Sequence, residues 1–350
     1  MIGNSAMLFI IYIRGIQMIK LAVLGCGRIG QMHARNVSNH PDFNLAAVYD
    51  VNKEFGENIA NELNVPLVSD DKEIFEDKDI DAVLIASPTD THIEFIEKSV
   101  ATNKPVYCEK PIDLDILKVN ECAKRLKSNK VPIHLGFNRR FDPGHVEAKE
   151  VLKSGEIGDL HQVLITSRDP GLPSWEYYQA AGGLLRDMTI HDFDISRFML
   201  DEDPTKVFAI TNALVEPKLK TELNDADTVM IIMETPSGKQ CHINNSRSSA
   251  YGYDQRIELV GNKGMVLSDN KKINNVRKFS SNGETTSVVE HFFLERYYDA
   301  FMNGLSSFAS CIKNNTVPEV GFEDGRKALL LAEAAYESLK THQMINVNYD

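Results

Sequence analysis

Short apolar runs alternate with stretches of helical periodicity along the first part of the chain. Such runs are typical of strands covered on both faces, and their alternation with helices predicts a mostly parallel sheet between two helical layers. The expected strands lie at 21–24, 45–49, 66–68, 80–86, 104–108 and 131–136, and the expected helices include 53–63, 93–102 and 115–127. This first α/β domain is expected to span residues 18–138.

The pattern changes after residue 138. Short strands separated by tight turn signals follow one another, which predicts a mainly antiparallel sheet. The expected strands lie at 160–167, 207–211, 228–234, 240–245, 256–260 and 265–268, and the expected helices at 145–154, 185–200, 295–312 and 323–340. A chain of 350 residues is long for one core, so we expect a second domain over residues 139–350 and an α/β fold overall.

A glycine-rich turn, Gly25-Cys26-Gly27-Arg28-Ile29-Gly30, follows the first strand and opens a helix. In a dinucleotide-binding unit Gly25 allows the tight turn, Gly27 lets the backbone approach a pyrophosphate, and Gly30 lets the helix pack on the sheet. The phosphates would bind free N–H groups at the helix N-terminus. A bare glycine motif is weak evidence, but the strand before it and the helix after it predict a dinucleotide site.

Asp50 ends the second strand, twenty residues after Gly30. Its carboxylate would accept hydrogen bonds from an adenosine ribose and would repel a 2′-phosphate, and no arginine follows it, so NAD is expected rather than NADP. Ligands bind at the carboxyl ends of parallel strands. Ser87, Glu109 and Lys110 should therefore open onto the same crevice as the glycine turn.

Net charge and cysteine spacing exclude several classes of protein. The formal charge of −12 argues against nucleic acid or an anionic membrane surface as a partner. The five cysteines are widely spaced and form no CxxC pair, which fits a reducing, cytoplasmic compartment rather than disulfides or zinc. Residues 1–17 contain an apolar run too short to span a bilayer. We expect them to be a loosely ordered leader, or to precede a true start at Met18.

Lys110 is a candidate for the chemistry of a nicotinamide enzyme. Such an enzyme needs a base for the hydroxyl proton and a charge that stabilises the developing alkoxide. Lys110 ends the strand expected to lie under the nicotinamide, so its ammonium group could bind the reacting hydroxyl. The alternative is a solvated turn lysine before Pro111.

Asp187 and His191 stand four residues apart, so on one helix they would share a face. The histidine could accept a proton near neutral pH, and the carboxylate could orient its ring. The alternative is a helix-start aspartate with an incidental histidine. Asp192 and Asp194 would point away from His191, so no metal site is expected.

Arg139 and Arg140 follow the first domain and could bind a polyol or the cofactor, or form salt bridges between domains. Tyr253 lies in an aromatic and polar segment, 251–256, before an expected strand. It could form a wall for a sugar, although aromatic residues at strand starts often only pack.

Three motifs in this order resemble those of the glucose–fructose oxidoreductase and inositol dehydrogenase superfamily, and within it the inositol 2-dehydrogenase group. They are the GCGRIG turn, Glu109-Lys110-Pro111 and the segment from Asp187 to Asp194. The segments 167–170 and 252–255 are similar to that group as well. The resemblance covers nearly everything from Met18 on.

The resemblance implies a Rossmann domain followed by an α/β domain with an open antiparallel sheet. It also implies metal-free, NAD(P)-dependent oxidation of a sugar or cyclitol hydroxyl, and a homo-oligomer (dimer or tetramer) built through the sheet faces. His191 would be the base, Lys110 would polarise the hydroxyl, and Asp187 would bind substrate and tune the pair. The implied cofactor contacts are Arg28, Ile29, Asp50, Ser87, His92, Glu109 and Lys110, with Arg140, Asp187, His191 and Tyr253 expected at the substrate.

The expected reaction is therefore NAD-dependent oxidation of myo-inositol, or a related polyol, to its ketone. Two alternatives remain open: a dehydrogenase of another polyol or aldose, and a non-catalytic NAD(P)-sensing protein. The loop at 170–175 departs from the family pattern, and it leaves the substrate undetermined.

Overall fold

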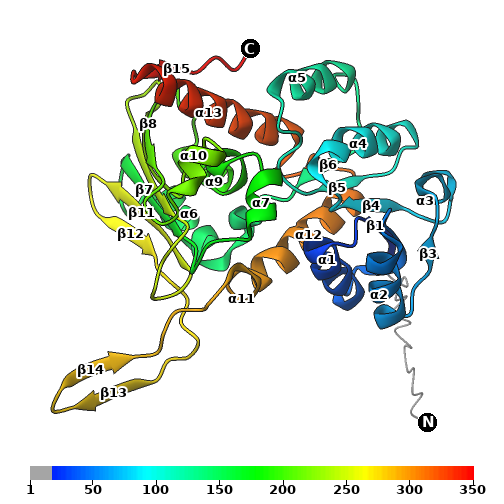
Figure 1. Cartoon of the computed structure of the whole chain (residues 1–350), viewed down its shortest axis with the longest axis horizontal. Helices are drawn as coiled ribbons and strands as arrows, with labels where there is room; N and C mark the ends of the chain where they lie inside the picture. Colours follow the sequence, from blue (N-terminus) through cyan, green and yellow to red (C-terminus); the bar gives the residue numbers. More distant parts are fainter. Residues whose placement is uncertain (1–17) are drawn as a thin grey trace, which may run out of the picture.

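Two large β-sheets with their helices, and a separate two-stranded hairpin, make up the described part of the protein (Figure 1). A computed structural model describes residues 18–350, so the expected leader at 1–17 lies outside the described residues. Within 18–350, no helix is long and apolar enough to cross a bilayer.

The first sheet is fully parallel, with the strand order β3-β2-β1-β4-β5-β6. Its strands are β1 (Ile19–Leu24), β2 (Phe43–Tyr49), β3 (Leu67–Val68), β4 (Ala82–Ile85), β5 (Val106–Cys108) and β6 (Ile133–Leu135). Every residue of β4, β5 and β6 is buried, as their apolar sequences predict. The strand order reverses between β1 and β4, so a crevice opens there at the carboxyl ends of the strands.

The helices of this domain are α1 (Arg28–Asn39), α2 (Lys53–Leu63), α3 (Asp71–Glu76), α4 (His92–Ala101) and α5 (Ile116–Arg125), with a short 3₁₀ turn η1 (Thr89–Thr91). Three of the helices, α2, α3 and α5, begin at a capping side chain. Asn52 and Asp115 cap α2 and α5 by accepting backbone N–H bonds. The apolar pattern does not predict α3, whose sequence signal is the capping box between Asp70 and Glu73.

The second sheet has the order β12-β11-β7-β10-β9-β8-β15, and all its neighbours are antiparallel except β7 and β10. Its strands are β7 (Leu160–Arg168), β8 (Lys206–Asn212), β9 (Thr228–Glu234), β10 (Gln240–Ser246), β11 (Asp254–Gly261), β12 (Met265–Ser268) and β15 (Ile345–Asn346). The predicted fold class, a parallel domain followed by a mainly antiparallel sheet, is confirmed. A separate hairpin, β13 (Arg277–Ser280) and β14 (Gly283–Thr286), follows β12 and is not predicted by the sequence pattern.

The helices after β6 include the ones that cover the second sheet. They are η2 (Asn138–Phe141, a 3₁₀ turn), α6 (Pro143–Ser154), α7 (Trp175–Ala180), α8 (Leu184–Asp187), α9 (Thr189–Leu200), α10 (Lys218–Glu222), α11 (Phe293–Arg296), α12 (Tyr298–Asn314) and α13 (Phe322–Thr341). α6, α9 and α13 pack on one face of the second sheet. The other face is open and carries exposed apolar side chains of Ile210, Met230, Ile232, Met265 and Leu267.

Two expected helices are each divided in the structure. The helix expected at 185–200 ends as α8 at Asp187 and resumes as α9 at Thr189. The break is a tightened turn at Met188, in which the His191 N–H donates to the Met188 carbonyl three residues earlier. The helix expected at 295–312 is likewise divided into α11 and α12 at Tyr297.

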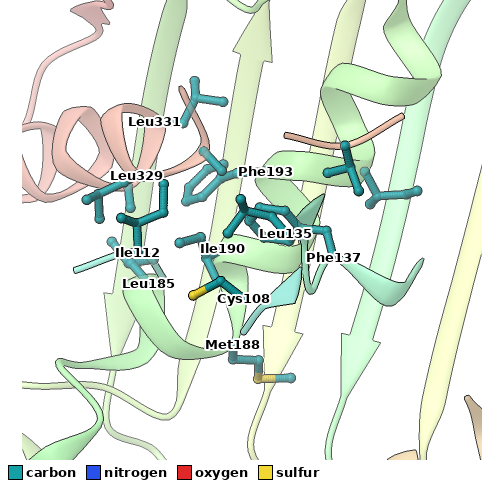
Figure 2. Packing of buried hydrophobic residues seen from close by; sticks show 14 of the residues in the cluster. Cys108, Ile112, Leu135, Phe137, Leu185, Met188, Ile190, Phe193, Leu329 and Leu331 are labelled. Carbon is teal, nitrogen blue, oxygen red and sulfur yellow. The ribbon is translucent and has the colours of Figure 1, made fainter. Parts of the chain in front are cut away.

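The two halves share their cores, so residue 138 is not a clean physical boundary. Leu305, Phe308 and Ala309 of α12 pack among the residues of the first sheet. Figure 2 shows a second shared region, where Leu135 lies with Phe193 of α9 and Leu329 of α13. This continuous packing fixes the crevice of the first sheet against α8 and α9.

Candidate active site

A cavity of about 700 Å³ lies between the two halves. The first domain contributes Arg28, Ile29, Ser87, His92, Glu109 and Lys110 to its wall. Asn138 lines it at the end of the first domain, and the second half contributes Arg139, Asp169, Tyr177, Asp187, His191, Tyr253, Phe293 and Tyr297. The structure therefore brings most of the sequence-predicted residues together.

The glycine turn has the shape that a pyrophosphate requires. Gly25 has φ +95°, and a Cβ there would lie 2.4 Å from the Ser87 nitrogen. A Cβ at Gly30 would lie 1.8 Å from the Gly25 oxygen, whereas one at Gly27 would meet no atom within 4 Å. No side chain caps α1, and its first turn contains no acidic residue. Free N–H groups and open space thus coincide at Gly27.

Asp50 lies beside the turn and is not part of the cavity wall. Its Oδ2 accepts the Cys26 N–H at 2.5 Å and its Oδ1 accepts the Asn52 N–H at 2.7 Å. Burial, with a contribution from the Asp50 charge, raises the pKa of the Cys26 thiol to about 12. Asp50 therefore holds the turn in place, in addition to any contact with a ribose.

Glu109 and His92 line the cavity, and each contacts polar groups of the first domain. His33 Nε2 lies 2.6 Å from Glu109 Oε1. The two ring nitrogens of His92 lie 2.8 Å from the Pro111 oxygen and 2.9 Å from the Ser87 oxygen. Burial lowers the pKa of His92, so its imidazole is neutral at pH 7 and donates its one N–H to only one of these two carbonyl oxygens.

Side chains from three separate parts of the chain donate hydrogen bonds to the Asp187 carboxylate. Lys110 Nζ lies 3.2 Å from Asp187 Oδ1 and 2.9 Å from the Asp187 carbonyl oxygen. The Tyr177 hydroxyl donates to Oδ1 at 2.8 Å, and Arg247 Nη2 donates to Oδ2 at 2.5 Å. Burial acts to raise the pKa of Asp187, but Lys110 and Arg247 hold it well below the usual value. Asp187 is thus a carboxylate at pH 7.

His191 lies in the first turn of α9 and faces the same cavity. Burial, together with the charges of Lys110 and Arg139, lowers the pKa of His191 well below its usual value. Its ring stands edge-on to Phe137, with centroids 5.9 Å apart, and its Nδ1 has no hydrogen-bond partner within residues 18–350. The ring is therefore neutral at pH 7. Asp187 and His191 meet across a helix break, not along the single helix face that the spacing predicts.

The two arginines after β6 have different environments. Arg139 lines the cavity, and its guanidinium pairs with Asp192 and donates to Ser167 at 2.8 Å. Arg140 does not line the cavity, which corrects the prediction that it contacts substrate. Its side chain is buried in ion pairs with Asp194 at 2.6 Å and Asp324 at 2.9 Å.

The carboxylates of Asp192 and Asp194 are therefore engaged in ion pairs with Arg139 and Arg140. Within residues 18–350, no group of three or more His, Cys, Asp or Glu side chains is placed to hold a metal ion.

Tyr253 lies in the cavity wall as expected, edge-on to Tyr297 with centroids 6.0 Å apart. The loop at 170–175 is not part of that wall, but Asp169 before it and Tyr177 after it are. The Arg28 guanidinium lies 6.0 Å from the centre of the Tyr177 ring, so α7 contacts the glycine turn.

Arg247 is a site residue that sequence reasoning missed. It is 6% exposed and bridges two cavity carboxylates, Asp187 at 2.5 Å and Asp169 at 2.9 Å. Its sequence signal is weak, because it lies in a polar run, 244–249, at the end of an expected strand. Arg247 directly follows β10, and only the position of that strand in the folded second sheet brings it to Asp187.

Comparison with known proteins identifies the family. Residues 19–137 match the oxidoreductase family with an NAD-binding Rossmann fold, and residues 145–267 match the GFO/IDH/MocA C-terminal domain. The chain belongs to the GFO/IDH/MocA family. The predicted resemblance is thereby confirmed.

Two similar relatives are named as inositol dehydrogenases. The chain is 40% identical to the inositol 2-dehydrogenase of Rhizobium meliloti (strain 1021), over 94% of this chain and 99% of that protein. It is 38% identical to the myo-inositol 2-dehydrogenase of Thermotoga maritima, over 94% and 98%. The chain is thus an NAD-dependent oxidoreductase of the inositol 2-dehydrogenase type.

Solved structures agree. The crystal structure of a putative myo-inositol dehydrogenase from Sinorhizobium meliloti 1021 superimposes with a TM-score of 0.91 at 40% identity, covering 95% of this chain and all of that one. The scyllo-inositol dehydrogenase of Lactobacillus casei, solved with NAD(H) and scyllo-inositol, has a TM-score of 0.87 at 29% identity, covering 94% and 99%.

Replacing Arg247 with Met should remove the cation that forms ion pairs with both Asp187 and Asp169. We expect the free energy of unfolding at pH 7 to fall by about 3–5 kcal/mol, the range for a broken buried ion pair. Urea denaturation measures the free energy of unfolding. Arg35→Met is the control, because Arg35 forms an exposed ion pair with Glu62 that should contribute less than about 1 kcal/mol. A loss no larger than the control's would contradict this role.

The same variant should change the acid sensitivity of the fold. Arg247 depresses the folded-state pKa of Asp187, so the stability that Asp187 contributes is present above its unfolded pKa of about 3.9 and is lost as the pH falls below it. Without Arg247 the depression is smaller. The stability lost between pH 5 and pH 2 should therefore be smaller in the variant.

Proposed function

We propose that this protein oxidises a secondary hydroxyl of myo-inositol, or of a closely related cyclitol or sugar, to the ketone with NAD. One observation carries the proposal: a single cavity has the dinucleotide turn on one side and Lys110, Asp187 and His191 on the other. The names of the relatives support an inositol as the substrate.

NAD fits the residues present. The uncapped start of α1 and the open space at Gly27 suit a pyrophosphate, and the cavity wall from Ile29 to Glu109 suits the nicotinamide half. When bound, NAD accepts the hydride. The Asp50 carboxylate beside the turn favours NAD over NADP, because it would repel a 2′-phosphate and the next residue, Val51, offers no compensating cation.

His191 is the proposed base. Its imidazole is neutral in the buried site, so it can take the hydroxyl proton as the hydride leaves carbon. Lys110 would donate a hydrogen bond to the same oxygen and stabilise its negative charge. Asp187, itself anchored by Arg247 and Tyr177, holds the ammonium group and offers an acceptor to a neighbouring hydroxyl.

The remaining wall suits a polyol. Asn138, Arg139, Asp169 and Tyr253 present donors and acceptors around the cavity, as a ring bearing several hydroxyls would need. A dehydrogenase of another polyol or of an aldose is the nearest alternative. A non-catalytic NAD(P)-sensing protein is less well supported, because a sensor needs no proton-transfer set.

A screen of inositol isomers, other polyols and aldoses with NAD and with NADP tests the reaction. Reduced nicotinamide absorbance should rise with myo-inositol or a close cyclitol, and NAD should support a higher kcat/KM than NADP. A preference for NADP would overturn the role of Asp50. Tight NAD binding with no turnover on any polyol would favour the sensor.

His191→Ala and Lys110→Met should each lower kcat by at least about two orders of magnitude, the scale of general acid–base catalysis. His161→Ala and Lys130→Met, which change exposed residues of the same types, are the matched controls and should retain activity. NAD binding, followed by fluorescence quenching of Trp175, should persist in the His191 variant. Turnover near the control level in either site variant would remove the role assigned to that residue.

A further inference from the structure

Tyr177 lies in the short helix α7, which is placed between the two large sheets (Figure 1). Tyr177, Ala180 and Ala181 line the cavity, and residues three and four positions apart share one face of a helix. Tyr178 instead packs in a small apolar cluster of the second half. α7 therefore presents one face to the cavity and is anchored by another, and Tyr177 is the large polar residue of the cavity face.

The Tyr177 hydroxyl completes the hydrogen bonds of the Asp187 carboxylate. Arg247 donates to Oδ2 at 2.5 Å, whereas Oδ1 accepts the Tyr177 hydroxyl at 2.8 Å and the Lys110 ammonium at 3.2 Å. Because donors on separate elements bind both oxygens, the carboxylate cannot rotate without losing one of these bonds. At Oδ1 the bond from Tyr177 is the shorter one.

The hydroxyl of Tyr177 acts only as a donor here. Although the whole residue is 37% exposed, burial of its hydroxyl, together with the Asp187 charge, raises the pKa of Tyr177 above its usual value. The phenol therefore stays protonated and donates to the carboxylate at every pH at which the fold is stable.

The same hydroxyl affects the Lys110 ammonium, which has three N–H donors. Two of them contact Asp187, one at the carbonyl oxygen at 2.9 Å and one at Oδ1 at 3.2 Å. The third can donate to a substrate oxygen. Without the Tyr177 hydroxyl, Lys110 would be the remaining donor to Oδ1 within residues 18–350. The ammonium group would then be drawn toward Asp187 and away from the substrate.

The ring of Tyr177 contacts the glycine turn. Arg28 is the first residue of α1, and its guanidinium lies 6.0 Å from the centre of the Tyr177 ring. The ring centres of Phe292 and Phe293 lie 6.0 and 5.6 Å from the same guanidinium. A cation is attracted to aromatic faces at this range. The three rings therefore hold the Arg28 guanidinium beside the turn that suits a pyrophosphate.

We propose that Tyr177 is a positioning residue for the hydride transfer and that it acts through two separable groups. Its hydroxyl orients the Asp187 carboxylate and so keeps the Lys110 ammonium available to the substrate oxygen. Its ring holds Arg28 beside the cofactor phosphates. The role of the hydroxyl rests on the proposed function, whereas the role of the ring concerns cofactor binding alone.

Tyr177→Phe removes the hydroxyl and keeps the ring. Its kcat, expressed per NAD-binding site counted by calorimetry, should fall at least about tenfold, the scale of a hydrogen bond to a charged group. KM for the polyol should change less than kcat, and the dissociation constant of NAD should stay within about twofold, because the ring remains. A purely structural role would lower the number of NAD sites and not the rate at each site.

Tyr178→Phe is the matched control, because the neighbouring Tyr178 hydroxyl has no hydrogen-bond partner within residues 18–350. This control should keep the wild-type kcat and NAD affinity.

Tyr177→Leu removes the ring as well. The dissociation constant of NAD should rise about threefold, the scale of a cation–π contact. In an Arg28→Met background the same substitution should change NAD affinity less than about 1.5-fold, because the cation that the ring holds is gone.

Each part of the proposal can fail separately. A wild-type kcat in Tyr177→Phe would overturn the role of the hydroxyl and leave the proposed oxidation intact. A wild-type protein that turns over no polyol would overturn the proposed function and the role of the hydroxyl together. An equal loss of NAD affinity from Tyr177→Leu with and without Arg28 would overturn the role of the ring, whatever the substrate.

Discussion

The buried carboxylate of Asp187 is the interaction on which the site depends. It accepts hydrogen bonds from Lys110 after β5, Tyr177 in α7 and Arg247 after β10. Residues that follow strands of both sheets therefore contact one charged group. A carboxylate in such a place is costly unless it is paired and hydrogen-bonded. Two cations and one hydroxyl keep it ionised, and the same contacts fix the position of the lysine ammonium.

The helix break at Met188 gives that carboxylate a neutral neighbour. Asp187 ends α8 and His191 lies in the first turn of α9, so both reach the cavity although they do not share one continuous helix. Burial lowers the pKa of His191 most, and Lys110, which stabilises the charge on Asp187, lowers it further together with Arg139. Asp187 is therefore ionised and His191 neutral at pH 7, in a cavity that the dinucleotide turn also borders.

Local patterns predicted much of this from sequence. The buried strands, the glycine turn and Asp50 each follow from short-range rules, and the motif order led to Lys110, Asp187 and His191. Contacts between distant segments did not follow. For Arg140 the sequence left open a contact with substrate or cofactor and salt bridges, and its side chain forms ion pairs with Asp194 and Asp324. Arg247 and Tyr177 reach Asp187 only through the folding of β10 and α7, and α12 completes the first core from far along the chain. The hydrophobic periodicity of a segment does not predict which distant segment it will contact.

The central claim, that this cavity transfers a hydride from a cyclitol carbon to NAD, has one direct measurement. The enzyme is incubated with NAD and myo-inositol deuterated at the carbon that bears the axial hydroxyl, and the reduced cofactor is analysed by mass spectrometry. Each reduced nicotinamide should carry one deuterium, and the rate should fall relative to unlabelled inositol. Reduced cofactor without deuterium, or no reduction with any inositol isomer, would contradict it.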